Sequence, residues 1–241
     1  PRHPTHFFYV NEAISELTAR FFNKSGLPHI ELKDKNKLAW LTWNLSWGRQ
    51  FDDYEYKQCA AWQKINHFAG TFLVGKKICL HERMIEFAKN LPNQANFYPL
   101  TFTTPDNLNE LAQKWKEIPY WIEKPSSSSR GEGIIIVSSK DSLPPITNEK
   151  FVIQQFIERP LLINGRHKFD VRLYVLVTSV SPLRVYLHQY GLARLAPHEY
   201  PASSETGLNI SDLSSLITNV SLNRCDSSFS MNEHKFSLQQ L

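Results

Sequence analysis

The chain has 241 residues, of which 41% are apolar and 21% charged, so we expect a globular protein of one or two domains with a sizeable core. Its three cysteines, Cys59, Cys79 and Cys225, exclude a disulfide framework and a CxxC zinc site and fit a reducing compartment. No apolar run approaches the ~18 residues of a membrane helix. The net charge of +4 agrees with an acidic partner without identifying one. The absence of an initiator methionine predicts a fragment or a processed product.

The first half of the chain combines an aromatic-rich segment with two predicted helices. Residues 38–43 read as a strand. The aromatic residues of 40–62 are better explained as core than as a base-stacking surface, because they do not interleave regularly with basic residues. Apolar spacing predicts a helix over 77–91 that ends before Pro92. A second helix is expected to begin at Thr104 as N-cap, with Pro105 at its first position and Trp115 on its apolar face.

The second half is dominated by strand patterns. Strands are predicted over 120–124, 134–137, 151–155, 168–177 and 184–189, with a loop at 141–149 and a weak helix at 235–241. The first two strands, joined by the loop 126–133, form a hairpin-like unit. This mixture predicts an α+β or α/β fold.

The loop 126–133 is rich in serine and glycine and is flanked by Lys124 and Arg130. Small residues let backbone N–H groups approach an anion closely, so the loop could hold phosphate. It lacks the GxxxxGK[ST] pattern of a P-loop. The alternative is an ordinary flexible hairpin tip.

A sharper signal lies at the start of the strand 168–177. Alternation places Lys168, Asp170 and Arg172 on one face of the strand. Charges at the end of a core strand are costly unless they are paired or bound to a ligand, which favours a grip on polyphosphate or carboxylate, with Arg172 as a bidentate fork and Lys168 as a point charge. A solvated strand face with self-neutralising charges remains the alternative.

Weaker candidates follow along the chain. Arg194 comes directly after the YGLA segment at 190–193, where it could reach a cleft or remain a surface arginine. Thr218 and Asn219 form a polar pair inside an apolar segment, which is typical of a turn or cap. The histidines show no metal-ligand spacing, and no GxSxG nucleophile motif occurs.

Taken in order, several segments resemble the tubulin tyrosine ligase-like family, most closely its polyglutamylase branch. The matching segments are INHFAGT (65–71), GKK (75–77), FYPLTF (97–102), WIEKP (121–125), SRGEGI (129–134), QQFI (154–157), PLL (160–162), KFDVR (168–172), VTS (177–179), YGLAR (190–194), TN (218–219) and HKF (234–236). Each segment is weak alone, whereas their shared order and spacing are specific.

The resemblance implies an ATP-grasp-like α+β (α/β) fold in which two lobes enclose the nucleotide and the C-terminal lobe is incomplete. Residues 1–74 would form a variable N-terminal lobe, 75–155 the central lobe and 156–241 part of the C-terminal lobe. The implied reaction uses ATP and Mg²⁺ to convert a carboxylate into an acylphosphate, which an amine then attacks.

The resemblance also implies roles for individual residues. Lys77 and Lys124 would contact phosphates, and Arg130 and Gly131 would belong to the flexible loop over the nucleotide. Lys168 and Asp170 would contact ATP and its ribose. The strand edge that contacts adenine would consist of Gln154, Gln155, Phe156 and Ile157. Arg172 and Arg194 would be the catalytic residues and, with Thr218 and Asn219, would surround the γ-phosphate and the incoming amino acid. Ser221 and Lys235 match positions that hold free glutamate.

Two departures from the family pattern bear on activity. The family's HLTN motif reads LITN at 216–219, with Leu216 in place of histidine, and Val220 replaces the aromatic residue that usually follows. The family's acidic EVN magnesium motif does not occur before Leu241, so we expect the Mg²⁺ ligands beyond Leu241, and this chain by itself to bind nucleotide poorly and to be inactive.

The expected partners are the acidic C-terminal tails of tubulin and free glutamate, without nucleic acid or membrane, for a monomer in the cytoplasm on microtubules, including those of a cilium or basal body. The alternatives are a tyrosine or glycine ligase of the same family, or a non-catalytic member that binds tubulin.

Overall fold

A computed structural model describes residues 8–11, 16–26, 29–31, 43–128, 131–139, 149–201 and 207–241. The predicted strand over 38–43 and the predicted loop over 141–149 fall almost entirely outside this part of the chain. The chain divides into two compact units, residues 1–80 and 81–241, and each is described by itself.

The first unit is built on a parallel sheet in the order β2-β1-β3-β4. Its elements are β1 (Phe8–Asn11), α1 (Glu16–Lys24), β2 (His29–Glu31), β3 (Leu45–Gly48), α2 (Asp53–Gln58), β4 (Lys64–Ile65) and α3 (Phe72–Gly75). Trp43 and Phe51 are buried with their ring centroids 6.1 Å apart, whereas Trp47, Tyr54 and Trp62 are exposed. The aromatic segment is therefore core only in part.

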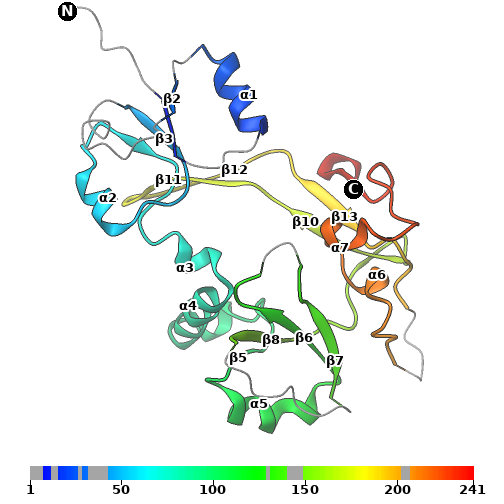
Figure 1. The fold of residues 1–241 in the computed structure, drawn as a ribbon. Helices are drawn as coiled ribbons and strands as arrows, with labels where there is room; N and C mark the ends of the chain where they lie inside the picture. Colours follow the sequence, from blue (N-terminus) through cyan, green and yellow to red (C-terminus); the bar gives the residue numbers. More distant parts are fainter. Residues whose placement is uncertain are drawn as a thin grey trace, which may run out of the picture. The chain divides into compact units, whose positions relative to one another are not determined.

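The second unit begins with a helix and a four-stranded antiparallel sheet in the order β5-β8-β6-β7 (Figure 1). Its elements are α4 (Lys77–Asn90), η2 (Pro92–Gln94), β5 (Thr101–Thr104), α5 (Leu108–Lys114), η3 (Trp115–Glu117), β6 (Tyr120–Pro125), β7 (Ile135–Ser138) and β8 (Phe151–Gln155). α4 runs across the division between the units. The predicted helix over 77–91 and the predicted hairpin are both confirmed.

One face of this sheet packs under α5. Phe102, Leu111, Trp115, Trp121 and Ile153 form its core, in which the Trp115 and Trp121 rings stack with centroids 5.8 Å apart. The indole Nε1–H of Trp121 also donates to the carbonyl oxygen of Trp115 at 3.3 Å. The sheet thus has a dry face against α5, and its other face carries Lys124.

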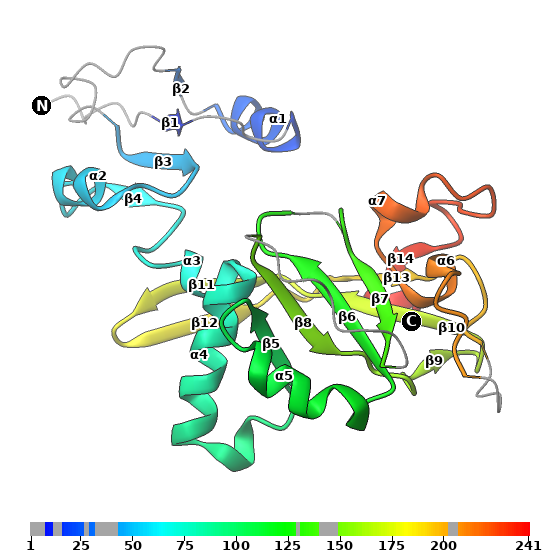
Figure 2. The ribbon, with the colours of Figure 1, turned by 60° about the horizontal axis from the view of Figure 1, so that its bottom comes forward.

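The remaining strands of the second unit form a second antiparallel sheet in the order β14-β13-β10-β9 and a separate hairpin of β11 and β12 (Figure 2). The elements are β9 (Leu162–Ile163), β10 (His167–Arg172), β11 (Val175–Val180), β12 (Leu183–Leu187), β13 (Leu192–Leu195), α6 (Leu213–Leu216), α7 (Val220–Asn223), β14 (Lys235–Ser237) and η4 (Leu238–Gln240). The observed fold is mixed α+β, as predicted. None of the described helices combines the length and apolar character that crossing a membrane requires.

Three predicted elements were wrong in detail. The strand predicted over 168–177 is interrupted after Arg172, since β10 pairs with β13 while β11, among the described strands, pairs only with β12. Thr104 ends β5, and a turn over residues 105–107 delays the helix, so Asn107 and not Thr104 is the N-cap position of α5. The side chain of Asn107 makes no cap hydrogen bond and instead accepts from Thr103 Oγ1 at 2.9 Å. The segment 235–241 starts as β14, not as a helix, because its backbone pairs with β13.

Candidate active site

Side chains alternate between the two faces of a strand, and this alternation separates the site from the hydrophobic core of the sheet β5-β8-β6-β7. Directly opposed residues on antiparallel strands share a face, so Phe102, Ile153 and Trp121 lie on the α5 side. Lys124 and Gln154 lie on the other face, with Ile122 and Ile136. That face packs on Phe156, Tyr200, Leu216 and Ile217, so it meets the part of the unit that contains the second sheet.

Lys124 is held by a chain of side chains on this face. Its Nζ donates to Gln154 Oε1 at 2.7 Å, and Gln154 Nε2 donates to Thr101 Oγ1 at 2.8 Å. Thr101 Oγ1 donates in turn to the Pro99 carbonyl at 2.7 Å. The amide of Gln154 is thereby fixed with its oxygen toward the lysine, which orients the ammonium group before any ligand arrives.

Lys168 lies close by on β10. Its Nζ stands 4.2 Å from the ring centroid of Phe156 and 5.9 Å from that of Tyr200, a cation–π arrangement. Burial, helped by the nearby Lys124 ammonium and opposed by Asp170, lowers the pKa of Lys168 to about 8. Two lysines therefore converge where an anion would relieve their mutual repulsion.

Asp170, two residues further along β10, ties three elements together. It lies opposite Arg194 of β13, which in turn lies opposite Lys235 of β14. Arg194 donates in a bidentate fork, Nε to Asp170 Oδ1 at 2.7 Å and Nη2 to Asp170 Oδ2 at 2.6 Å. Thr218 Oγ1 donates to Asp170 Oδ2 at 2.5 Å. The carboxylate positions both the arginine and the turn between α6 and α7.

Gly131 brings the loop 126–133 against α7. Its φ is +96°, a conformation that favours glycine, and a Cβ there would come within 2.8 Å of Leu222 Cδ1 and 3.0 Å of Asn219 Nδ2. The loop and Asn219 thus meet through a position that tolerates no side chain.

The other predicted residues are distributed as follows. Gln155 ends β8, Phe156 is buried, Ile157 is exposed, Arg172 ends β10 with an exposed side chain, and Ser221 is exposed on α7. Lys77 is the first residue of α4, where burial lowers its pKa, and it belongs to the first unit. Arg130 lies outside the described residues.

The sequence reasoning missed two residues of this site and one buried carboxyl group on the opposite face of the sheet. Thr101 orients Gln154, and Tyr200 lies under Lys168 and donates its hydroxyl to the Glu158 carbonyl at 2.7 Å. Glu123 is buried on the α5 face, where burial raises the pKa of its carboxyl group. The alternation Trp121-Ile122-Glu123-Lys124 could have located Glu123, because it puts the carboxyl group on the side of Trp121.

Comparison with known proteins gives an independent finding. A family model described as "Tubulin-tyrosine ligase family" matches residues 55–241. The chain is 35% identical over 178 residues to a "Probable beta-tubulin polyglutamylase" of Tetrahymena thermophila, covering 72% of this chain and 14% of the relative. It is 34% identical over 206 residues to "Tubulin polyglutamylase TTLL6" of Homo sapiens, covering 83% and 22%.

A "Tubulin monoglutamylase TTLL4" of Mus musculus is 30% identical over 226 residues, covering 90% of this chain and 18% of the relative. The chain therefore spans less than a quarter of the length of these three relatives.

Proposed function

Because the chain belongs to the tubulin-tyrosine ligase family, we propose that it is part of an ATP-dependent ligase that adds glutamate to glutamate side chains in the acidic C-terminal tails of tubulin. The names of its relatives support this choice, since they include polyglutamylases and a monoglutamylase of tubulin. Residues 75–155 and 156–241 would be the lobes around the nucleotide, in a monomeric enzyme acting on cytoplasmic or ciliary microtubules.

The observation that carries the proposal is the convergence of Lys124, Lys168 and the Asp170–Arg194 fork on strands of two sheets. A bound anion would stabilise the charged form of a lysine whose pKa is lowered and which lies beside a second lysine. An arginine held by a carboxylate presents its remaining N–H groups in a fixed direction. This set suits a triphosphate next to a reacting carboxylate.

The residues fit ATP as follows. Lys124 and Lys168 would bind phosphate oxygens, the edge 154–157 would contact adenine, and the loop with Arg130 and Gly131 would cover the phosphates. When bound, ATP would supply the γ-phosphoryl group that activates a tail carboxylate, with ADP as the leaving group, so that the amine of glutamate could form the amide with release of phosphate. Arg194 would stabilise the charge on the transferred group.

Free glutamate would be held by Arg172, Ser221 and Lys235. Arg172 offers a bidentate fork to a carboxylate, and Lys235 of β14 lies directly opposite Arg194 of β13. Asn219 and Thr218 would line the same end. Leu216, which replaces the family's histidine, is fully buried against Phe156 and Tyr200, so in this chain it acts as packing beneath the site.

Magnesium has no evident set of ligands in the described part of the chain. Among those residues, no group of three or more histidine, cysteine, aspartate or glutamate side chains is arranged to hold a metal ion. We therefore assign no step of the mechanism to a metal held by these residues.

The direct test is incorporation of labelled glutamate into tubulin with ATP and Mg²⁺, using this chain beside a polypeptide that continues beyond Leu241. Lys124→Ala should reduce incorporation at least about 100-fold, because one preorganised charge on the transferring phosphate is lost. The control is Lys114→Ala, whose ammonium pairs with the exposed Glu117 at the end of α5. Normal turnover in Lys124→Ala would contradict the site assignment, and incorporation of tyrosine or glycine instead would contradict the substrate.

Titration of Lys168 gives a second test. A lysine is charged below its pKa, so we expect affinity for ATP to fall about tenfold as the pH rises from about 7 to about 9. Lys168→Arg stays charged over this range and should flatten the profile. Isothermal titration calorimetry of both proteins measures this, and identical pH profiles would show that Lys168 does not contact the phosphates.

The second candidate function is binding of tubulin without catalysis, favoured by the positive net charge and the replacements at Leu216 and Val220. In that case microtubule binding would weaken at high salt, while neither this chain nor the longer polypeptide would incorporate an amino acid.

A further inference from the structure

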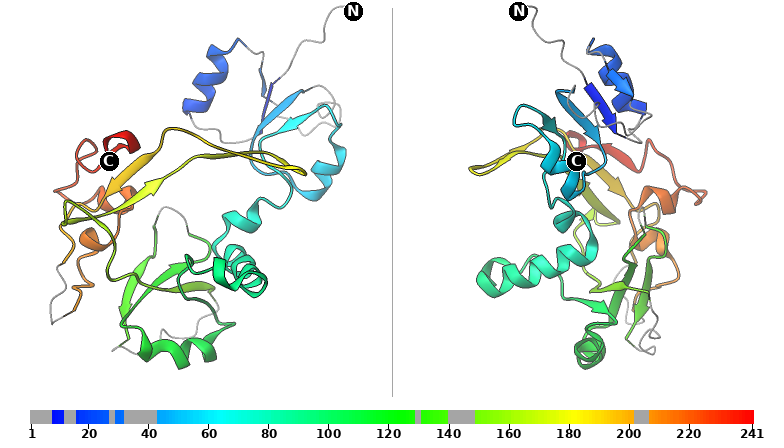
Figure 3. Two further views of the ribbon diagram at one scale, coloured as in Figure 1. Left: turned by 180° about the vertical axis from the view of Figure 1, so that it is seen from behind. Right: turned by 60° about the vertical axis from the view of Figure 1, so that its left-hand side comes forward.

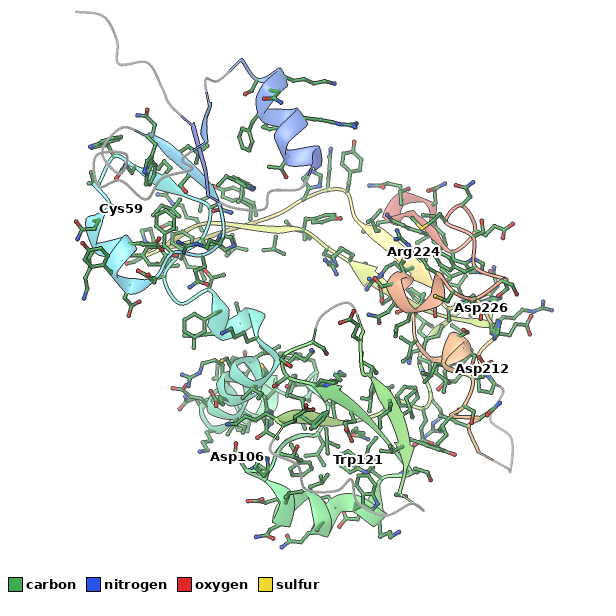
Figure 4. All side chains as sticks on the ribbon, in the orientation of Figure 1. Cys59, Asp106, Trp121, Asp212, Arg224 and Asp226 are labelled. Atoms are coloured by element: carbon green, nitrogen blue, oxygen red, sulfur yellow. The ribbon has the colours of Figure 1, made fainter. Side chains whose placement is uncertain are left out.

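A cluster of polar side chains lies outside the proposed site, where the chain passes from β13 to α6 and leaves α7. His198 follows β13, Asp212 is the N-cap residue of α6, and Asp226 comes just after α7. Figure 4 shows Asp212 and Asp226 near one another beside these two helices. Thr218 and Asn219 lie in the turn between α6 and α7.

Both ring nitrogens of His198 face carboxylates. Nδ1 lies 3.0 Å from Asp212 Oδ1, and Nε2 lies 3.2 Å from Asp226 Oδ2. A neutral imidazole has one N–H and one lone pair, so it can donate to only one of the two carboxylates. Both contacts are attractive only when the ring is a cation that donates from each nitrogen.

Asp226 is fixed independently of the histidine. Ser228 Oγ and Ser228 N donate to Oδ1 at 2.6 and 2.9 Å, and Ser214 Oγ of α6 donates to Oδ2 at 2.7 Å. These donors, the Ser228 hydroxyl first, hold the pKa of Asp226 far below its usual range. The carboxylate therefore remains charged at neutral pH.

We propose that His198, as a cation, closes the segment 212–226 by joining its two ends, and thereby positions Thr218 and Asn219 beside Asp170. The segment lies within the connection between β13 and β14, so a bridge between its ends reduces the conformations available to the turn between α6 and α7. The consequence for catalysis rests on the proposed function, whereas the closure of the segment does not.

The charge of His198 sets the direction of the pH effect. Hydrogen bonding to Asp212 raises its pKa above the usual 6.5, with Asp226 adding to the effect and burial opposing it. Because folding raises the pKa of His198, the closure is complete at pH values below the pKa of this histidine in the unfolded chain. It is lost as the pH rises through the pKa of His198 in the folded protein. The neighbouring Glu199 is paired with Arg166 at 3.1 Å, and Arg224 caps α7; among the described charged groups, Asp212 and Asp226 act on the ring.

The test is hydrogen–deuterium exchange of the full chain, read for residues 213–223 between about pH 6 and pH 9 and corrected for intrinsic exchange. In the unmodified protein we expect exchange in this segment to become roughly two- to fivefold faster as His198 loses its proton, the effect of one exposed charged pair. His198→Gln should exchange fast at every pH. His198→Arg, a permanent cation with several donors, should exchange slowly at every pH.

The matched control is His188→Gln, which removes an exposed histidine whose Nδ1 contacts the Tyr190 backbone and should leave the pH profile unchanged. The proposal would be overturned if exchange in the unmodified protein did not depend on pH. It would also be overturned if His198→Gln and the unmodified protein had the same pH profile of exchange. ATP affinity, measured on the same variants, should follow the exchange. Closure by exchange, together with no ligase activity in the polypeptide that continues beyond Leu241, would leave this inference standing and contradict the proposed function instead.

Discussion

Replacement of Asp170 by alanine is expected to reduce glutamate incorporation at least about 100-fold, a loss as large as that expected for Lys124→Ala. Asp170 accepts from Arg194 at 2.6 and 2.7 Å and from Thr218 at 2.5 Å. Its removal frees the guanidinium from its fixed direction and leaves a partly buried charge without its partner. A single substitution thus disturbs β10, β13 and the turn before α7 together.

The measurement is kcat and KM for ATP and for glutamate, with far-UV circular dichroism to establish that the fold is kept. Asp170→Asn preserves the volume and one hydrogen-bond acceptor but removes the charge, and we expect it to fail nearly as badly because the fork needs a carboxylate. Glu117→Gln, which breaks an exposed ion pair with Lys114 at 2.7 Å, is the control and should change little. Asp170→Ala with more than half of normal kcat/KM would contradict this account.

The largest effect on stability is expected for Trp121→Ala, about 3–5 kcal/mol of unfolding free energy. Trp121 is 0% exposed and its ring stacks on Trp115 at 5.8 Å in the core under α5. Alanine would leave a cavity where the indole contacts Phe102 and would remove the hydrogen bond to the Trp115 carbonyl. Since Lys124 lies three residues further along β6, the site should lose its support as well.

Urea denaturation followed by far-UV circular dichroism measures this loss. The control is Phe97→Ala, which removes an aromatic ring of which 69% is exposed and should cost less than about 1 kcal/mol. Equal midpoints for the two variants would show that the core under α5 does not determine the stability of residues 81–241.

Local sequence patterns predicted much of the sheet β5-β8-β6-β7. Short strand-like runs in WIEKP, stopped by Pro125, and in FVIQQ indicated the strands that are β6 and β8. The shared face of Lys168 and Asp170 follows from the period of two in a strand. The helix over 77–91 followed from its apolar spacing and from Pro92. In these elements the order of apolar and polar residues along the chain indicates which face is buried.

Information about pairing was missing from the sequence pattern. The run after Arg172 is apolar, which predicted a buried continuation, but β11 pairs with β12 alone among the described strands and its side chains are largely exposed. Likewise, residues 235–241 had a weak helical pattern, but residues 235–237 pair with the edge of β13 as a strand. The fork of Asp170 and Arg194 joins residues 24 positions apart, and the bridge of His198 joins residues from three parts of the chain, so neither has a local signature.

The hairpin of β11 and β12 has a consequence for handling the protein. Figure 3 shows it as a long yellow ribbon, and neither of its strands pairs with another described strand. Leu176, Val180, Leu183 and Leu187 are each more than 60% exposed. Open strand edges with apolar side chains on both faces are templates for association between copies. Solutions of the purified 241-residue chain should therefore self-associate at high concentration, even though the proposed enzyme is a monomer, so that apparent affinities depend on how dilute the sample is.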